Sequence, residues 1–492
     1  MSGNAEPPSA DDLAARAVEM IGRQRFDEAE ALAREALAAA PRHLTANLAR
    51  AACARARGAL DVAEGCLEVV LADHPASAAG HSSLGMVRLR QERLEEAEGL
   101  FAKAVALDPK DAVNAFRWGE CLRRLGRLEA AETAFVEALR RQPDQTDTLF
   151  QLATVRGEMG RSEEACGLLE RLLAVDPENA SARFNLGFHY LRLGRLAAGW
   201  PLYEARWQHP EAPARRFAET PWDGSEAGAR HLLVHAEQGL GDAIQFVRFV
   251  PQLAARAERV TLLCQRSLLG LFRRSLALEV LGFEDPLPPA HGHVPLLSLP
   301  GLLGTTLEKL PAEVPYLHPR ETASLPGQPA IGICWAGNPE FSRNQARSCP
   351  AALFAALLQG TGATFYGLKK DASGEDLALF AESGRFVDLA AEWQDFEQSA
   401  TALAGLDLVI TTDTVVAHLA GALGRPTWLL LHQDPDWRWR LEGETSPWYP
   451  NTQALPPAPA RRLDGTGGAR RQGTRRLLPD LILPRPSAMT GA

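Results

Sequence analysis

The first part of the chain repeats a single pattern of apolar and polar positions. Prolines recur every 34 residues, at Pro41, Pro75, Pro109, Pro143 and Pro177. Between successive prolines, two amphipathic stretches flank a short polar break, as in PASAAGHSSLGMVRLRQERLEEAEGLFAKAVALD. Because proline lacks the N–H that would continue a helix, each one ends the second stretch. Each unit is therefore predicted to be a helical hairpin.

Two further columns keep the same phase. One is mostly large and apolar, at Phe26, Leu60, Leu94, Leu128, Ser162 and Leu196. The other is small, which lets two helices approach closely, at Ala29, Ala63, Ala97, Ala131, Ala165 and Gly199. The sixth unit departs from the pattern because Pro201 falls in its second helix and Trp200, Tyr203 and Trp207 are added. We interpret it as a capping unit that docks onto the next part of the chain.

The second half of the chain has a different pattern of apolar and polar residues. After a connector rich in Pro, Ala and Gly near residues 209–229, short apolar runs alternate with helical stretches, at 231–236, 259–264, 293–297, 330–336, 363–368, 386–389, 406–411 and 427–431. Continuous apolar strands between helices indicate parallel sheets covered on both faces. A proline-rich stretch at 310–330 separates the third run from the fourth. We interpret it as a linker and expect two Rossmann-like domains with a cleft between them.

Polar groups follow the strand predicted at 406–411. In such sheets ligands bind at the carboxyl ends of the strands. Asp413, Thr414 and His418 come directly after this strand, and a helix that begins near Thr414 would present unpaired backbone N–H groups suited to a phosphate. The alternative is structural, with Asp413 or Thr414 as an N-cap and His418 as a satisfied core histidine. Both interpretations stay open on this motif alone.

Two other loops strengthen the functional interpretation. HAEQGLGDAIQF places Gly239, Gly241 and Asp242 after the first strand, although its spacing is not G-x-G-x-x-G, so a dinucleotide cofactor is weakly supported. All three loops are predicted to fall on the same edge of their sheets. A carboxylate on one domain would then face phosphate-binding groups on the other. The second loop, CWAGNPEFSRNQARS, contributes Trp335, Gly337, Asn338 and Arg347, the last a fixed cation for a phosphate.

Composition and charge restrict the class of protein. A length of 492 residues suggests several domains, and 46% hydrophobic with 23% charged residues is typical of a soluble globular chain. The net charge of -9 argues against a protein built to coat nucleic acid. The seven scattered cysteines have no C-x-x-C pair and are interpreted as reduced thiols. With no apolar run of membrane-spanning length and no leader-like start, we predict a cytoplasmic protein.

The repeated hairpins resemble the tetratricopeptide repeat, whose period and helix-turn-helix unit match over residues 10–208 as five full units and the capping unit. The resemblance implies a superhelix whose concave surface holds a protein or peptide partner. The alternative is a spacer that binds nothing.

The later motifs resemble the family 9 bacterial glycosyltransferases, which are related to heptosyltransferases. They are GLGDAIQFVRFVP, WAGNP followed by RS, DTVVAHLAGALGRPTW, and DWRW followed by SPWYP. The resemblance implies a GT-B fold, with a first, acceptor-side domain at 230–310 and a second, donor-side domain at 328–450. It also implies inverting transfer from a nucleotide sugar without a metal or other cofactor.

The resemblance assigns roles residue by residue. Asp242 would be the general base that deprotonates the acceptor hydroxyl, with Gly239 and Gly241 in the acceptor-side loop. The donor would be held by Asp413, Thr414 and His418, by Arg347, which would stabilise the leaving diphosphate, and by Trp335 and Asn338. Gly421 would permit close helix packing near the site. Repeats joined to a GT-B unit also resemble the architecture of O-linked N-acetylglucosamine transferases, in which the superhelix selects protein acceptors.

Some positions depart from the family pattern. Phe341, Arg343, Asn344 and Gln345 differ from the usual H-x-N-D-R-x-R-S phrase, and Lys369 stands where a glutamine is usual. These changes leave the donor open and allow a noncatalytic scaffold with a relic domain as the alternative function. The DPD at 434–436 offers a weaker alternative, the metal-binding D-x-D of the other glycosyltransferase fold.

The end of the chain breaks the pattern. Residues 451–492 are rich in Pro, Gly and Arg and have no amphipathic period, so they are predicted to be disordered. The resembled family ordinarily ends with a helix introduced by a phrase like RQPRPGDW. Plausible codons for this stretch, read one base out of register, give a similar phrase. We therefore hypothesise a frameshift near residue 450.

Overall fold

The structure is a computed structural model that describes residues 8–208, 217–225, 230–340, 344–358, 361–432, 434–439 and 443–455. The chain divides into two compact units, Met1–Ala182 and Arg183–Ala492. Secondary structure follows the division, because the described part of the first unit is helical and both sheets belong to the second. The predicted α + α/β class is confirmed.

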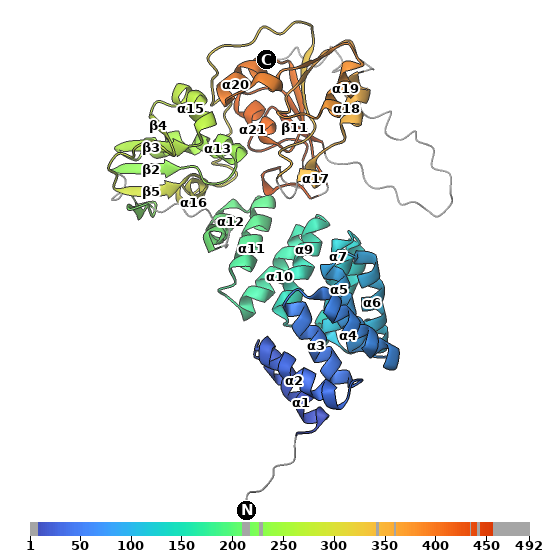
Figure 1. Cartoon of the computed structure of the whole chain (residues 1–492). Coiled ribbons are helices and arrows are strands. Elements are labelled where there is room, and N and C mark those ends of the chain that lie inside the picture. The colour runs from blue at the N-terminus through green and yellow to red at the C-terminus, as the bar shows by residue number, and fades with distance from the viewer. Residues whose placement is uncertain are drawn as a thin grey trace, which may run out of the picture. The chain divides into compact units, whose positions relative to one another are not determined.

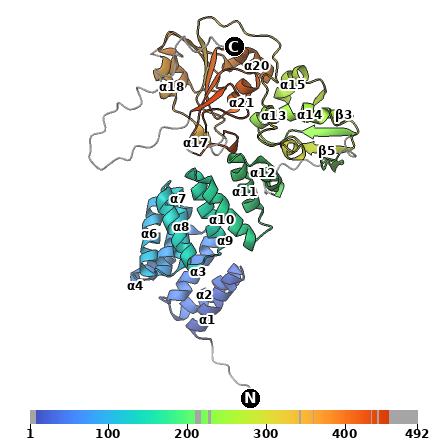
Figure 2. The same cartoon turned by 180° about the vertical axis from the view of Figure 1, so that it is seen from behind.

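The first unit is built from helices that pair as successive hairpins, stacked side by side in both views (Figures 1 and 2). Each hairpin places a helix of 13 residues before one of 14. The helices are α1 (Ala10–Gly22), α2 (Phe26–Ala39), α3 (Leu44–Ala56), α4 (Leu60–Asp73), α5 (Ala78–Arg90), α6 (Leu94–Leu107), α7 (Ala112–Arg124), α8 (Leu128–Arg141), α9 (Thr146–Glu158) and α10 (Ser162–Val175).

The repeated columns of the sequence form the contacts within the hairpins. The small column is completely buried, at Ala29, Ala63, Ala97, Ala131 and Ala165. Gly85 shows why small residues are needed, since a Cβ there would lie 2.8 Å from the ring of Phe101 on the next helix. Gly126 adopts a φ of 72° in the turn between α7 and α8, a conformation that disfavours side chains. The 34-residue period therefore fixes both the packing and the turns.

The second unit begins with a further helical pair. It consists of α11 (Ala180–Arg192), which spans the boundary between the units, and α12 (Leu196–Tyr203), followed by the short η1 (Glu204–Gln208). Pro201 lies inside α12. The Trp200 indole packs edge-on against Phe246 and Trp437 and donates to the carbonyl of Thr305. This pair, predicted as a capping unit, thus shares a core with the α/β part of its own unit.

The first sheet is parallel throughout, in the order β1-β5-β2-β3-β4. Its strands are β1 (Thr220–Pro221), β2 (His231–His235), β3 (Arg259–Cys264), β4 (Glu279–Gly282) and β5 (Gly292–Pro295). The helices between them are α13 (Leu240–Phe246), α14 (Val250–Ala254) and α15 (Leu269–Ser275), and α16 (Leu299–Leu302) comes after β5. Strand β2 is buried along its whole length, as its continuous apolar run predicts.

The second sheet is also parallel, in the order β11-β10-β9-β6-β7-β8. Its strands are β6 (Ala330–Cys334), β7 (Thr364–Gly367), β8 (Phe386–Asp388), β9 (Leu408–Thr412), β10 (Thr427–Leu430) and β11 (Thr452–Leu455). Alternate residues enter different clusters: Val409 joins the core shared with the first sheet, and Ile410 joins a second core on the other face. The helices are α17 (Asn344–Arg347), α18 (Ala351–Leu358), α19 (Gly374–Ala381), α20 (Phe396–Ala404) and α21 (Val415–Ala422).

The structure corrects the sequence prediction at two points. Strands β1 and β4 were not predicted. Strand β11 lies in the stretch predicted to be disordered, where Thr452 pairs with Thr427 and Leu455 with Leu430 of β10. The strand is short and flanked by prolines, so its pattern is too weak to recognise. Residues 456–492, including most of the hypothesised frameshift, lie outside the described residues.

No helix in the described part of the chain is both long and apolar enough to cross a membrane.

Candidate functional site

The site is built where α13 of the first sheet packs against α21 of the second. Each helix begins directly after a strand, α13 after β2 and α21 after β9. A Cβ at Gly241 would lie 2.8 Å from Cδ2 of His418, so glycine allows the close approach of the two helices. Gly239 is the N-cap of α13. The two helices that follow β2 and β9 therefore lie against one another, and the donor and acceptor roles of their residues stay predictions.

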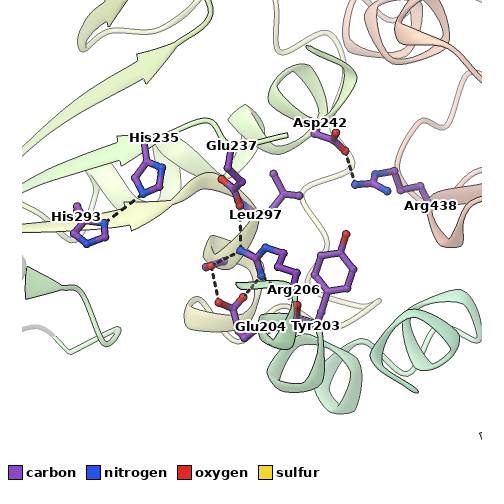
Figure 3. Close-up of polar contacts among 10 residues, drawn as sticks. Tyr203, Glu204, Arg206, His235, Glu237, Asp242, His293, Leu297 and Arg438 are labelled. Carbon is purple, nitrogen blue, oxygen red and sulfur yellow. Dashed lines mark hydrogen bonds and ion pairs between the residues drawn. The ribbon is translucent and has the colours of Figure 1, made fainter. Parts of the chain in front are cut away.

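Asp242 lies at the third position of α13. Its Oδ2 accepts a hydrogen bond of 2.9 Å from the backbone N–H of Gly239, which closes a cap on the helix. Its Oδ1 accepts from Nη2 of Arg438, which follows β10 of the second sheet (Figure 3). The carboxylate retains a side-chain exposure of 20%. It is thus fixed in direction by its own helix and paired across the two sheets.

Arg438 was not predicted, yet it connects the site. It lies in η7 (Trp437–Trp439), and its Nη1 donates to Oδ1 of Asp436 at 2.8 Å. Its guanidinium lies 4.5 Å from the ring centroid of Trp437 and 5.6 Å from that of Phe246. Burial acts to lower the pKa of Arg438, but the charges of Asp436 and Asp242 outweigh burial and raise it. The guanidinium therefore remains a buried cation shared by two carboxylates.

Asp413 and Arg347 lie near this group. Burial, together with the charge of Asp436, raises the pKa of Asp413 to about 6, while Arg347 and Arg438 act to lower it. A Cβ at Gly337 would lie 3.3 Å from Nη2 of Arg347 and 3.6 Å from Cγ2 of Thr414. The structure therefore brings Arg347 to the beginning of α21. Two arginines and two carboxylates that belong to the second sheet and its loops therefore lie in this region, Arg347, Arg438, Asp413 and Asp436.

Thr414 and His418 have local partners. Thr414 is the N-cap of α21, and its Oγ1 accepts from the N–H of Val416 at 3.2 Å. His418 is 6% exposed, its Nδ1 lies 3.0 Å from the hydroxyl of Tyr449, and its ring stacks on Trp439. Burial lowers the pKa of His418 to about 3, so the imidazole is neutral. These contacts favour the structural interpretation of both residues, and their part in donor binding stays a prediction.

The two predicted residues of the loop after β6 have different surroundings, because Trp335 lies in the second core and Asn338 lies in a turn. Trp335 is buried, and its Nε1 donates to Oδ2 of Asp376 at 2.9 Å. Its ring packs edge-on against Phe380 in the second core. Asn338 accepts from the N–H of Glu340 at 3.0 Å within its own turn. Trp335 is thus held within the core, and donor binding by either residue stays a prediction.

Behind the site, Tyr449 and Arg248 join the two halves. Gly421 faces the Tyr449 ring, where a Cβ would lie 2.5 Å from Cγ, which supports the predicted role of Gly421 in close packing. Nη1 of Arg248 donates to the carbonyl of Trp448 at 2.6 Å, and its Nη2 donates to the hydroxyl of Tyr316 at 2.9 Å. Arg248 and Tyr449 were missed although both lie in the quoted motifs, because buried arginine and tyrosine give no periodic signal.

The DPD segment has arginine partners on both aspartates. Asp434 accepts from Nη1 of Arg192 at 2.7 Å, and Asp436 accepts from Arg438. Among the described residues, no group of three or more His, Cys, Asp and Glu side chains is arranged to hold a metal ion.

A second buried ion pair lies beside the site (Figure 3). Nη2 of Arg206 donates to Oε1 of Glu237 at 3.0 Å and to Oγ of Ser298 at 2.7 Å. Its Nη1 pairs with Glu204. Burial raises the pKa of Glu237 to about 7 even though Arg206 acts to lower it. This network ties the short helix after α12 to the carboxyl ends of β2 and β5.

Comparison with known families agrees with the two halves of the sequence. One tetratricopeptide repeat profile matches residues 60–112, and the profile of the middle TPR-like domain of cilia and flagella-associated protein 70 matches residues 90–205. The profile of glycosyltransferase family 9 (heptosyltransferase) matches residues 323–454. The chain combines tetratricopeptide repeats with a family 9 glycosyltransferase domain. The family 9 match contains Arg347, Asp413 and Arg438, whereas Asp242 lies before it.

The chain is also similar to Protein FlbA of Caulobacter vibrioides. The two are 26% identical over 305 residues, which cover 54% of this chain and 50% of FlbA. The chain thus spans about half the length of this curated relative.

The repeats of this chain are similar to solved structures, with low TM-scores. PilW, described as a type IV pilus biogenesis factor, is 24% identical with a TM-score of 0.37, over 40% of this chain and 91% of PilW. YrrB, described as a TPR protein with an unusual peptide-binding site, is 20% identical with a TM-score of 0.30, over 35% of this chain and 90% of YrrB.

Proposed function

We propose that the second unit transfers a sugar from a nucleotide-sugar donor to an acceptor hydroxyl with inversion and without a metal ion. The observation that carries the proposal is the position of Asp242, a partly exposed carboxylate at the start of α13, against Arg438 from the donor-side half. A general base must lie within hydrogen-bond reach of the acceptor proton. Asp242 is the carboxylate for this role, and the two sheets form a GT-B pair around it.

The donor side is proposed at the beginning of α21. The leaving group of such a reaction is a nucleoside diphosphate, which gains negative charge as the glycosidic bond to the donor breaks. Arg347 and Arg438 supply fixed cations there, and the helix start adds the positive end of its dipole. Asp413 borders the same region. A donor diphosphate that reaches Arg438 would compete with Asp242 for the guanidinium, which would release Oδ1 to accept a proton.

The repeats are proposed to bring a protein acceptor. Stacked hairpins present an extended surface suited to a peptide, and the first unit consists of such hairpins in its described part, of which residues 60–112 match a tetratricopeptide repeat profile. A lipid-linked or polysaccharide acceptor would keep the same chemistry and change the partner.

One observation favours a noncatalytic scaffold as the second candidate. Both oxygens of Asp242 already have donors, the backbone N–H of Gly239 and the guanidinium of Arg438. If no ligand displaces Arg438, the carboxylate has no role beyond joining the two halves. Donor binding distinguishes the candidates, because only an enzyme requires it.

The first experiment is a thermal-shift and calorimetric screen of the full chain against ADP-, GDP-, UDP- and dTDP-sugars. A ligand that binds the folded state raises its apparent stability. Saturable binding of one donor, weakened in Arg347→Gln and His418→Gln, would support the enzyme. Absence of binding by every donor would refute it and leave the scaffold.

The second experiment tests the base. With the donor identified, release of nucleoside diphosphate is measured for Asp242→Asn, which keeps the shape of the side chain. We expect donor affinity to be retained and turnover to fall by about 10²–10⁴-fold. Asp12→Asn is the matched control, because Asp12 holds the same third position and cap in α1. Equal turnover in Asp242→Asn and the wild type would eliminate Asp242 as the base.

A further inference from the structure

Tyr203 is a buried tyrosine at the edge of the candidate site. It is the last residue of α12, so it belongs to the capping pair of helices and to neither sheet. The residue is 4% exposed. A Cβ at Gly187 of α11 would lie 2.7 Å from the backbone nitrogen of Tyr203, so the two helices are in close contact at this point. The packing of α11 against α12 therefore fixes the position of Tyr203.

Three side chains hold the ring of Tyr203. Its centroid lies 5.2 Å from the Phe184 ring and 6.0 Å from the Trp437 indole, and the guanidinium of Arg206 lies 5.4 Å from it. Trp437 directly precedes Arg438 in η7, and the guanidinium of Arg438 lies 4.5 Å from the Trp437 ring. The ring of Tyr203 thus lies against the segment that carries Arg438.

The hydroxyl of Tyr203 is directed toward the ion pair of Asp242 with Arg438 (Figure 3). The charges that act on its pKa agree with this direction, because they include those of Arg438, Asp242 and Asp436. Burial raises the pKa of Tyr203, and Arg438 acts to lower it. The phenol therefore keeps its proton and can donate a hydrogen bond.

This hydroxyl has no protein partner in the part of the chain that the structure describes. The other two buried tyrosines differ in this respect. The hydroxyl of Tyr366 donates to the carbonyl of Pro326, and that of Tyr449 lies 3.0 Å from Nδ1 of His418. Buried tyrosine hydroxyls ordinarily find a partner, because an unpaired polar group loses its bonds to water on burial. An unpaired phenol directed at the candidate base therefore indicates a ligand.

The charges beside Tyr203 suit a neutral hydroxyl better than an anion. An anion next to the phenol would also lie next to Asp242, and the carboxylate would repel it. A neutral hydroxyl can donate its proton to a carboxylate and accept the hydrogen bond of the phenol at the same time. The acceptor hydroxyl of the proposed transfer is such a group.

We propose that the hydroxyl of Tyr203 donates a hydrogen bond to the acceptor hydroxyl and orients it toward Asp242. In the transfer step the acceptor oxygen forms a bond to the anomeric carbon of the donor. The bond from that carbon to the diphosphate breaks, its electron pair leaves with the diphosphate, and the acceptor proton passes to Asp242. Tyr203 keeps its own proton. The inference rests on the proposed function and adds that the capping pair supplies a residue to the acceptor side of the site.

The test measures release of nucleoside diphosphate by the full chain, from the donor that the binding screen identifies. Water is the attacking group in one arm, and methanol, the smallest alcohol, is added in the other, where methyl glycoside is also measured. Tyr203→Phe removes the hydroxyl and keeps the ring. We expect kcat to fall about tenfold while the KM and Kd of the donor stay unchanged, because a poorly oriented attacking group slows only the chemical step. Tyr366→Phe is the matched control and should keep the kcat of the wild type.

Stability and coupling separate this role from a structural one. Tyr203→Phe should unfold at the temperature of the wild type, because it loses no hydrogen bond within the described protein, whereas Tyr366→Phe should unfold lower, because it loses the bond to Pro326. When added to Asp242→Asn, Tyr203→Phe should cause little further loss of kcat, since both groups act on the same acceptor hydroxyl. A kcat equal to that of the wild type, or a full tenfold loss on top of Asp242→Asn, would overturn the inference.

Failure of the proposed function has a different outcome. If no donor binds, the glycosyl transfer itself is refuted. If a donor binds but the wild type releases no diphosphate to water or methanol, the roles given to Asp242 and Tyr203 are both wrong, and donor binding still stands. If the wild type and Tyr203→Phe release diphosphate equally fast, the role of Tyr203 alone is refuted.

Discussion

Gly421→Ala is expected to destabilise the second unit, even though alanine is the better helix former. Gly421 lies in the last turn of α21, where the added methyl carbon would be 2.5 Å from Cγ and 2.9 Å from Cε1 of Tyr449. Carbon atoms pack without strain at about 3.5–4.0 Å. One of the two groups must therefore move by about 1 Å.

Tyr449 has little room to move. Its side chain is completely buried, its hydroxyl is bonded to Nδ1 of His418, and the guanidinium of Arg248 lies 4.5 Å from its ring centroid. Overpacking of this kind costs about 1–3 kcal/mol, against a gain of about 1 kcal/mol from helix propensity. Because the ring is held by both partners, we expect the upper part of that range and a net loss of about 1–2 kcal/mol.

The assay is urea denaturation followed by tryptophan fluorescence. Nine of the ten tryptophans lie after residue 182, and the exception is Trp118, so the signal reports mainly on the second unit. The midpoint should fall in Gly421→Ala with an unchanged slope. Gly374→Ala is the matched control, because a Cβ at this helical glycine meets nothing within 4 Å, and it should cause no loss. A midpoint in Gly421→Ala at or above that of the wild type would refute the packing argument.

Two further predictions concern the same unit. The pKa of His418 is lowered to about 3 from an ordinary 6.5, so the unfolded chain binds the extra proton first and the stability due to this residue is lost as the pH falls below 6.5. Between pH 7 and 5.5 the free energy of unfolding should fall by about 1.3 kcal/mol more in the wild type than in His418→Gln. Urea titrations of the two proteins that show no such difference would contradict this prediction. Trp200→Ala should cost about 3–5 kcal/mol, since the indole is 3% exposed in the shared core. The half-buried Trp207→Ala should cost less, and similar midpoints for the two variants would count against a shared core.

The sequence predicted those parts of the fold whose signal is repeated or continuous. The proline and alanine columns recur in every hairpin, and the central strands are apolar over their whole length because both of their faces are buried. Strands β1, β4 and β11 have two to four residues each and lie at sheet edges, where burial on one side leaves too few positions for a pattern. These three edge strands therefore escaped prediction, whereas β8, the remaining edge strand, was predicted at 386–389.

The sequence predicted the site residues that directly follow strands, but it did not predict the arginines that pair with the carboxylates of the site. Strand ends are visible in the sequence because polar residues such as Asp242 and Asp413 come after an apolar run. The partner of Asp242 lies 196 residues further along the chain. No local pattern connects two such positions, so Arg438 appears only once the two sheets are placed together. The same holds for Arg192 and Asp434.

The contacts of Arg248 determine which segments of this chain must be inherited together. From the first half this side chain reaches the carbonyls of Pro311 and Trp448 and the hydroxyl of Tyr316, so it depends on the linker and on the second half. A recombination event inside the linker would leave a buried guanidinium with carbonyls from an unrelated parent. Exchange of either sheet alone is therefore expected to fail.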